Sequence, residues 1–185
     1  MRVIARRGNA GVRVADVAEE VGVTPATVSY SFPAVEAPLL QAHQAAFNHY
    51  YEQRLAAAAA HEHPCERLVA AIEAGIPDQP DVAWRVLAQS IGTATRSVPH
   101  AALLGSLTDR EVSVFANVLE LGVERGCFRL RGELRDVART IVHLTDAVGL
   151  ETQLASPVMD PREARRLVLA YARMATCLDE GHGHG

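Results

Sequence analysis

The fold of this chain is decided by the stretch Arg13-Val-Ala-Asp-Val-Ala-Glu-Glu-Val-Gly-Val-Thr-Pro-Ala-Thr-Val-Ser-Tyr-Ser-Phe-Pro33. Its first half has apolar residues at helical spacing, and these predict one buried helix face made of Val14, Val17, Ala18 and Val21. Gly22 permits the positive φ that ends a helix, and Val23 is expected to pack into the turn. Thr24 is a favourable N-cap and Pro25 a favourable first helical residue. A helix, a glycine turn and a second helix predict a helix–turn–helix motif.

The second helix of this motif is expected to present a polar face to solvent. Val28 and Phe32, four residues apart, would anchor its buried side. The other side chains are small or hydroxylated, with one aromatic, Tyr30. Such a face suits a recognition helix, because it lets the backbone enter a major groove about 12 Å wide and bond phosphates or base edges. The alternative is an αα-hairpin of a helical bundle with a polar outer face.

Residues 15–33, together with Val35-Glu-Ala-Pro-Leu-Leu40, resemble the DNA-binding domain of the tetracycline-repressor (TetR) family of transcriptional regulators. The resemblance implies a homodimer that binds a pseudo-palindromic DNA operator, and a small-molecule inducer held by the C-terminal domain. By position, the DNA contacts would fall on Arg13, Thr24, Pro25, Ala26, Thr27, Ser29, Tyr30 and Ser31. Two departures stand out. Val35 replaces a lysine that usually contacts phosphate, and residues 1–8 resemble only the last half of the usual first helix.

The rest of the chain is also predicted to be helical. A 3.6-residue period dominates, no stretch alternates convincingly as a strand would, and glycines and prolines separate about nine segments. Longer helices are expected at 35–61, 81–98, 107–125, 133–155 and 161–179, and Glu111 is expected near a helix start. The predicted fold is all-α, with a helix–turn–helix DNA-binding domain at residues 1–50 and a larger helical ligand-binding and dimerisation domain at residues 51–185.

Two helices near the C-terminus carry stripes of small residues beside stripes of bulky ones. Small residues permit close helix approach, so two such helices per subunit predict an intersubunit four-helix bundle. The expected dimer interface comprises Ala138, Val142, Thr145, Gly149, Val168, Ala172 and Ala175. The pattern alone equally allows both stripes to be core within one chain, and the family resemblance favours the dimer.

An inducer pocket is expected among the helices between residues 35 and 126. The candidate lining residues are Phe47, Tyr51, Leu68, Ile72, Trp84, Leu87, Ile91, Thr95, Phe115 and Leu119. Most are apolar and lie at helical spacing, so ordinary core is the alternative reading of each one. The few aromatic residues and the scarcity of inward charges predict an uncharged or weakly polar, hydrophobic ligand.

The composition narrows the function further. The 185 residues include no lysine, which excludes mechanisms that need a Walker lysine or a lysine Schiff base. Three widely separated cysteines predict neither a disulfide framework nor a metal site, and the His61/His63 and His182/His184 pairs lack further ligands at a recognisable spacing. We expect no catalytic residues, cofactor, metal or membrane span, and a cytoplasmic location. The leading hypothesis is a repressor released by a small hydrophobic inducer. The rival is a small-molecule-binding or interaction protein of the same fold that has lost operator binding.

Overall fold

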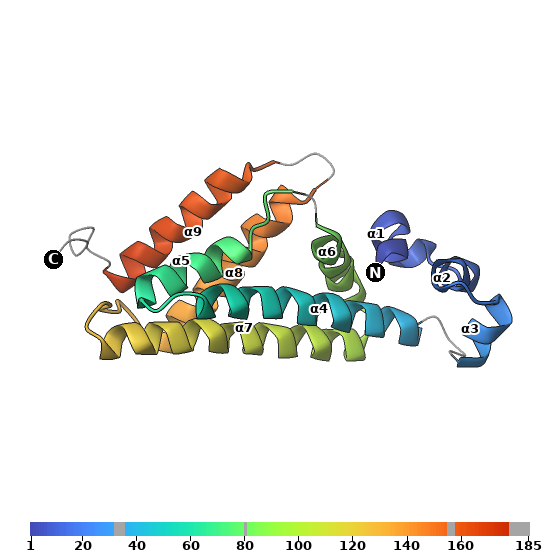
Figure 1. The fold of residues 1–185 in the computed structure, drawn as a ribbon, viewed down its shortest axis with the longest axis horizontal. Coiled ribbons are helices and arrows are strands. Elements are labelled where there is room, and N and C mark those ends of the chain that lie inside the picture. The colour runs from blue at the N-terminus through green and yellow to red at the C-terminus, as the bar shows by residue number, and fades with distance from the viewer. Residues whose placement is uncertain (32–35, 80, 155–157, 178–185) are drawn as a thin grey trace. The chain divides into compact units, whose positions relative to one another are not determined.

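The computed structural model describes residues 1–31, 36–79, 81–154 and 158–177. Within these ranges the secondary structure is helical and contains no strand, which confirms the predicted all-α fold. The helices are α1 (Arg2–Arg7), η1 (Asn9–Gly11, a 3-10 turn), α2 (Val14–Val21), α3 (Pro25–Ser31), α4 (Glu36–Ala59), α5 (Pro64–Ala74), α6 (Val82–Ala94), α7 (Val98–Glu124), α8 (Leu134–Thr152) and α9 (Pro161–Thr176), as Figure 1 labels them. None of the described helices combines the length and apolar character that crossing a bilayer requires.

The chain divides into two compact units. The first contains Met1–Tyr50 and Pro80–Leu107, and the second contains Tyr51–Gln79 and Thr108–Gly185. Helices α4 and α7 therefore each contribute residues to both units. Helix α6 and the beginning of α7 pack with the first fifty residues, although they come much later in the sequence. The functional boundary at residue 50 stays a prediction.

The helix–turn–helix of the first unit forms as the sequence predicts. Gly22 ends α2 in the left-handed region, with φ 71° and ψ 31°. The Thr24 hydroxyl caps α3 by accepting a hydrogen bond from the Thr27 N–H at 3.2 Å, and Pro25 is the first helical residue. Val28 is buried, whereas its predicted partner Phe32 lies outside the described residues, as do Pro33 and Val35.

Two valines of this motif are more exposed than predicted. Val21 is 62% exposed and Val23 is 42% exposed, so neither belongs to the buried core. Val21 is the last residue of α2, and the left-handed turn at Gly22 follows it directly. The apolar cluster of this unit centres on Ile4, Ala46, Ala83 and Val86, from α1, α4 and α6. The short helix α2 therefore buries Ala18 in its middle, while Val21 at its C-terminal end is exposed to solvent.

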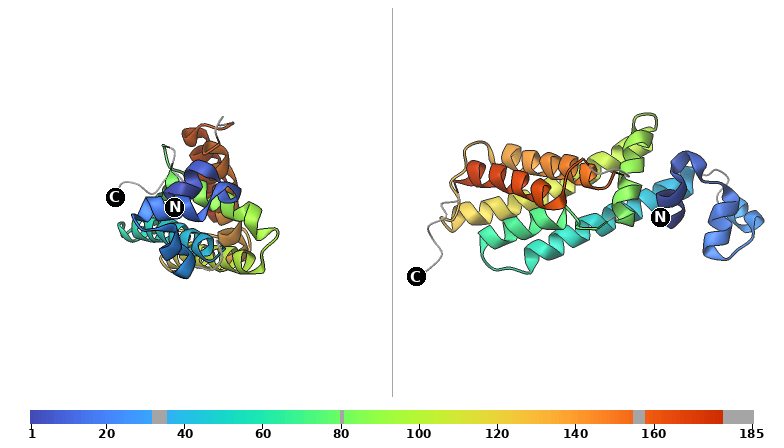
Figure 2. Two further views of the ribbon diagram at one scale, coloured as in Figure 1. Left: turned by 90° about the vertical axis from the view of Figure 1, so that its right-hand side faces the viewer. Right: turned by 90° about the horizontal axis from the view of Figure 1, so that it is seen from above.

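The second unit has the larger apolar core. Helices α8 and α9 pack side by side, and α5 packs on α9 (Figures 1 and 2). The small residues predicted for the dimer interface are buried here within one chain: Ala138, Val142, Thr145, Gly149, Val168, Ala172 and Ala175. Within one chain these side chains are covered by their own helices, and their place in a dimer interface stays a prediction. Leu167 and Met174 are the large apolar side chains of α9 that remain exposed.

The start of α7 differs from the sequence prediction. The sequence predicts separate helices at 81–98 and 107–125, with Pro99 in the break between them, but α7 begins at Val98 and continues for 27 residues. Proline is tolerated in the first turn of a helix, where its missing N–H has no intrahelical acceptor. Glu111 therefore lies in the middle of this long helix, not near its start. Near the other end of α7, the Gly122 carbonyl accepts hydrogen bonds from the N–H groups of Cys127 and Phe128.

Candidate nucleic-acid interface

The residues predicted to contact DNA are all exposed in the structure. They are Arg13, Thr24, Pro25, Ala26, Thr27, Ser29, Tyr30 and Ser31. Seven of them lie on α3 or on its N-cap, and Arg13 immediately precedes α2. Tyr30 is 91% exposed, the largest exposure among the large hydrophobic side chains described. The hydroxyls of Thr24 and Thr27 are 2.9 Å apart, so they bond each other as well as facing solvent.

Charge around this motif is partly neutralised within the chain. Glu20 of α2 forms ion pairs with Arg2 at 2.6 Å and with Arg6 at 2.9 Å, both from α1. The Asp16 carboxylate accepts a hydrogen bond from the backbone N–H of Arg13 at 3.0 Å and thereby closes the first turn of α2. Residues 1–63 carry five arginines and six acidic residues, so phosphate attraction must come from where the arginines lie.

Asn9 ties the start of the motif to two later helices of the same unit. Its side-chain amide donates to the Gln89 carbonyl at 2.9 Å and to the Thr93 hydroxyl at 2.6 Å, both on α6. Its Oδ1 lies 3.3 Å from Nε2 of His43 on α4. One side chain thus connects η1, α4 and α6 by hydrogen bonds, which are directional contacts. No local pattern in the sequence predicts this role of Asn9, because its partners are 34 to 84 residues away along the chain.

His43 and His100 form a buried pair beside this connection. Their rings meet edge to face, with centroids 5.0 Å apart, and Ser97 Oγ lies 2.9 Å from His100 Nδ1. The pKa of His43 is lowered to about 4, first by burial and then by the neighbouring charges of His100 and the N-terminal amine. His43 is therefore neutral at pH 7 and contributes apolar packing and one hydrogen bond.

The residues predicted to line an inducer pocket are divided between the two units. Phe47, Trp84 and Leu87 are buried in the first unit, where Ile91 of α6 and Thr95, the C-cap of α6, are exposed. In the second unit, the residues Leu68, Ile72, Phe115 and Leu119 belong to the main core cluster, with Tyr51 packed against it. These ten residues as an inducer site stay a prediction, and most of the buried ones pack as core.

An ionic cluster in the second unit was not predicted. Arg54 of α4 is fully buried and contacts Glu111 Oε1 at 2.8 Å and Asp146 Oδ1 at 3.6 Å. Its guanidinium also lies over the Phe115 ring, 5.4 Å from the centroid. Burial raises the pKa of Glu111, against the opposing attraction of Arg54. In the sequence, Arg54 is a single arginine within the helical pattern of α4. An arginine at such a position is equally typical of an exposed residue.

Other residue groups give no metal site within the described part of the chain. No set of three histidine, cysteine or acidic side chains there could hold an ion. His63 instead caps α5, because its Nδ1 accepts a hydrogen bond from the Cys65 N–H at 3.3 Å. Its Nε2 lies 3.8 Å from Cys127 Sγ. His182 and His184 lie outside the described residues.

The fold and the exposed face of α3 define an all-α helix–turn–helix protein with a second helical core. No protein-family model and no curated protein sequence matches the chain. Solved structures do match, and they confirm the predicted resemblance: the chain has the fold of TetR-family transcriptional regulators.

Three of these structures illustrate the similarity. A Saccharomonospora viridis protein assigned as a transcriptional regulator, solved in complex with choline, is 25% identical with a TM-score of 0.81. The alignment covers 92% of this chain and 89% of that one. A TetR transcription regulator from Haloarcula marismortui is 17% identical with a TM-score of 0.79, over 95% and 93% of the two chains. A TetR-family regulatory protein from Rhodococcus RHA1 is 20% identical with a TM-score of 0.72, over 96% and 93%.

Proposed function

We propose that this protein is a DNA-binding transcriptional regulator that acts in the cytoplasm as a repressor and leaves its operator when a small hydrophobic inducer binds. The observation that carries the proposal is the exposed, hydroxyl-rich face of α3 within a helix–turn–helix of the TetR fold. The matching solved structures are regulators, not enzymes. No catalytic role is therefore proposed.

The DNA contacts proposed for α3 follow from its surface. The hydroxyls of Ser29 and Ser31 can bond phosphate oxygens or base edges, and Ala26 permits close approach of the backbone. Tyr30 offers a long, rigid side chain with a hydroxyl at its tip. Arg13 supplies positive charge at the beginning of α2, and it gains importance because Glu20 already pairs Arg2 and Arg6.

The response to inducer is proposed to pass through Asn9. A ligand that shifts α4 or α6 must also shift or break the hydrogen bonds from Asn9 to His43, Gln89 and Thr93. Ligands change a conformational equilibrium only through unequal affinity for its two states. The hydrogen bonds from Asn9 to α6 and to α4 would be present in one state and broken in the other, because short directional bonds are lost over small displacements.

An uncharged inducer is favoured by the chemistry of the second core. The Saccharomonospora viridis structure holds choline, a cation. In this chain the carboxylates of Glu111 and Asp146 and the ring of Phe115 already surround the guanidinium of Arg54. Both carboxylates thus already have a cationic partner, and an added cation would have to compete with Arg54 for them. Apolar neighbours such as Leu68 and Leu119 suit a hydrophobic ligand instead.

A homodimer is part of the proposal, since a pseudo-palindromic operator requires two reading heads. The exposed Leu167 and Met174 of α9 are proposed to meet the second copy in place of the buried small-residue stripes. Light scattering at micromolar concentration is expected to give twice the 19.9 kDa chain mass. A monomer would contradict this part, and Met174→Glu is expected to produce one.

The test of DNA binding is a footprint and gel shift with the DNA that flanks the gene of this protein. Wild type is expected to protect one discrete site, whereas Tyr30→Ala should bind it about tenfold more weakly, since a good side-chain contact to DNA is worth about 1–3 kcal/mol. Val158→Ala removes another exposed side chain, in the second unit, and is the matched control. A small apolar compound that releases the DNA and raises the melting temperature would identify an inducer.

One observation favours a second function, that of a ligand-binding or interaction protein of this fold without operator binding. Glu20 neutralises two of the arginines nearest the motif, which lowers its attraction for phosphate. If wild type protects no discrete site while still binding a small apolar compound, this second function is correct and the repressor is not.

A further inference from the structure

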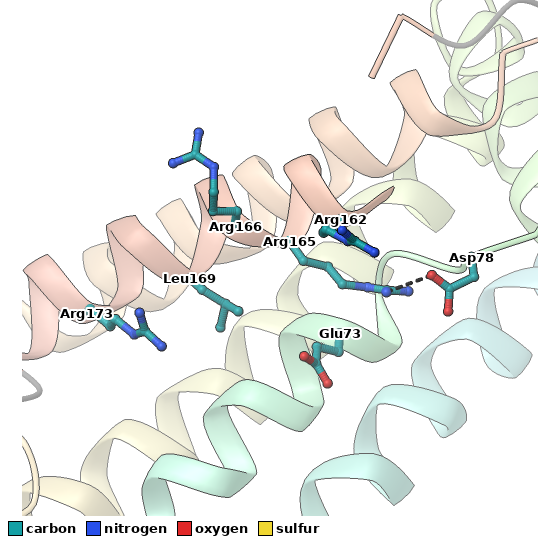
Figure 3. A pocket seen from close by; sticks show the side chains of 7 residues that line it. All are labelled: Glu73, Asp78, Arg162, Arg165, Arg166, Leu169 and Arg173. Carbon is teal, nitrogen blue, oxygen red and sulfur yellow. Dashed lines mark ion pairs between the residues drawn. The ribbon is translucent and has the colours of Figure 1, made fainter. Parts of the chain in front are cut away.

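The second unit contains a hollow lined by arginines that the proposed repressor function does not use. Its volume is about 470 Å³, and α9, α5 and the segment after α5 surround it (Figure 3). The lining residues are Glu73, Asp78, Arg162, Arg165, Arg166, Leu169 and Arg173. This volume lies within the range of small-molecule sites, about 300–1,000 Å³. None of these residues is among the apolar candidates for the inducer.

The arginines gather here because of helical spacing. Arg162, Arg165 and Arg166 are three and four residues apart on α9, and Leu169 continues the same face. Arg173 follows one turn later. Five of the seven lining residues therefore come from one rigid helix, and α5 supplies Glu73. Sites built on helices hold their groups in fixed positions.

Two of the guanidiniums are held in place by neighbouring groups. Arg165 pairs with Asp78 at 2.7 Å and donates two hydrogen bonds to the Ile76 carbonyl, at 2.6 and 3.2 Å. Arg166 makes a two-pronged pair with Glu163, at 2.6 and 2.7 Å. These contacts hold the pKa values of the Asp78 and Glu163 carboxyls below their usual range. The positions of positive charge around the hollow are thus fixed before any ligand arrives.

The lining has four guanidiniums and the two carboxylates of Glu73 and Asp78, and Glu163, which pairs with Arg166, adds a third carboxylate, so one positive charge remains in the sum. Arginine stays charged at all physiological pH values and presents a planar fork of donors that matches oxyanions. Leu169 adds an apolar patch for the carbon skeleton of a ligand. The two carboxylates oppose a bare anion, but they also accept hydrogen bonds from hydroxyl groups.

We propose that this arginine hollow binds a small organic polyanion, a molecule that carries a phosphate group or several carboxylates together with hydroxyls. Arg162 and Arg173 supply positive charge for the anionic groups, and Arg165 positions Asp78. The site is independent of operator and inducer binding, so it is measured on the full chain without DNA.

The experiment is calorimetry at low ionic strength with two probes, inorganic pyrophosphate and citrate. Saturable binding of at least one probe is expected, and the preferred probe distinguishes a phosphate ligand from a polycarboxylate. Arg162→Gln is expected to weaken binding about tenfold, in keeping with the loss of a charge-assisted hydrogen bond. Glu73→Gln removes an opposing carboxylate and is expected to tighten binding severalfold.

Matched controls separate a site from general surface charge. Arg135→Gln removes an exposed arginine of α8 that does not line the hollow, and it should leave binding unchanged. Melting temperatures of all variants establish that they fold. Failure of both probes to bind at millimolar concentration overturns the proposal. An equal loss in Arg135→Gln and Arg162→Gln also overturns it, because that result would mean that overall charge alone attracts the probes. Weaker binding in Glu73→Gln overturns it as well, because removing an opposing carboxylate beside a bound polyanion cannot weaken its binding.

Discussion

Arginine is used in opposite ways in the two compact units. In the first, the side chains of Arg2 and Arg6 are 76% and 70% exposed while both pair with Glu20. In the second, Arg54 is fully buried between Glu111 and Asp146. Exposed ion pairs contribute about 0–1 kcal/mol, because water and salt screen them. A buried pair costs several kcal/mol to break by removing one partner. Arg2 and Arg6 can therefore exchange Glu20 for DNA phosphates, whereas the buried pair of Arg54 with Glu111 is fixed.

The largest effect is expected from Arg54→Ala. The substitution removes the charge that faces Glu111 and leaves a hole over Phe115. We expect a loss of about 3–5 kcal/mol in the free energy of unfolding, measured by urea denaturation. The double variant Arg54→Met/Glu111→Leu should recover most of the loss, since an apolar replacement of both partners is often neutral. A loss below about 1 kcal/mol in Arg54→Ala would remove the contrast between the units.

Lowering the pH is expected to reduce the free energy of unfolding by up to about 3 kcal/mol, because His43 of the first unit becomes protonated on unfolding. Its folded pKa of about 4 lies below the unfolded value near 6.5, so the unfolded state binds the proton first as pH falls. Stability is therefore complete above pH 6.5 and declines toward pH 4. His43→Gln removes this contribution to the pH dependence. Identical slopes for wild type and His43→Gln between these pH values would show that His43 is not the group concerned.

A smaller effect is expected from two glycines of α7. A methyl group on Gly122 would collide with the buried Phe128 ring, whereas one on Gly105 would meet open space. Gly122→Ala should destabilise by about 1–3 kcal/mol, as overpacking does. Gly105→Ala should stabilise by about 0.5–1 kcal/mol, the usual gain in helix propensity. Thermal unfolding distinguishes the two, and opposite signs are the expected result.

The smallest effect is expected from Glu20→Gln, which releases Arg2 and Arg6 in the first unit. Operator affinity at low salt should rise up to about fivefold, the equivalent of one exposed ion pair. The dependence of binding on salt should become steeper, because more phosphates are neutralised. Glu19→Gln, an exposed neighbour on α2, controls for the change in net charge. Equal effects of both variants would mean that the ion pairs with Glu20 do not compete with DNA.

Local signals in the sequence predicted local structure. Gly22, Thr24 and Pro25 fix a turn and a cap through their own backbone preferences, and the structure has both. Pro99 misled the prediction, because a proline that starts a helix and one that separates two helices look alike along the chain. The small stripes of α8 and α9 fit either an intrachain or an interchain contact, and periodicity cannot decide which helix covers them. The partners of Arg54 and Asn9 depend on tertiary packing and leave no local signal.

The side-chain amide of Asn9 also makes the protein sensitive to slow chemical change during storage. Its amide nitrogen faces the Gln89 carbonyl and the Thr93 hydroxyl, while its oxygen faces a ring nitrogen of His43. Slow hydrolysis of that amide would change one nitrogen into an oxygen, with almost no change in size. A donor would then become an acceptor opposite a carbonyl, and repulsion would replace the bond. A stored sample would thus keep its mass to within one dalton and keep its helices, while losing the hydrogen bonds that connect η1 to α6.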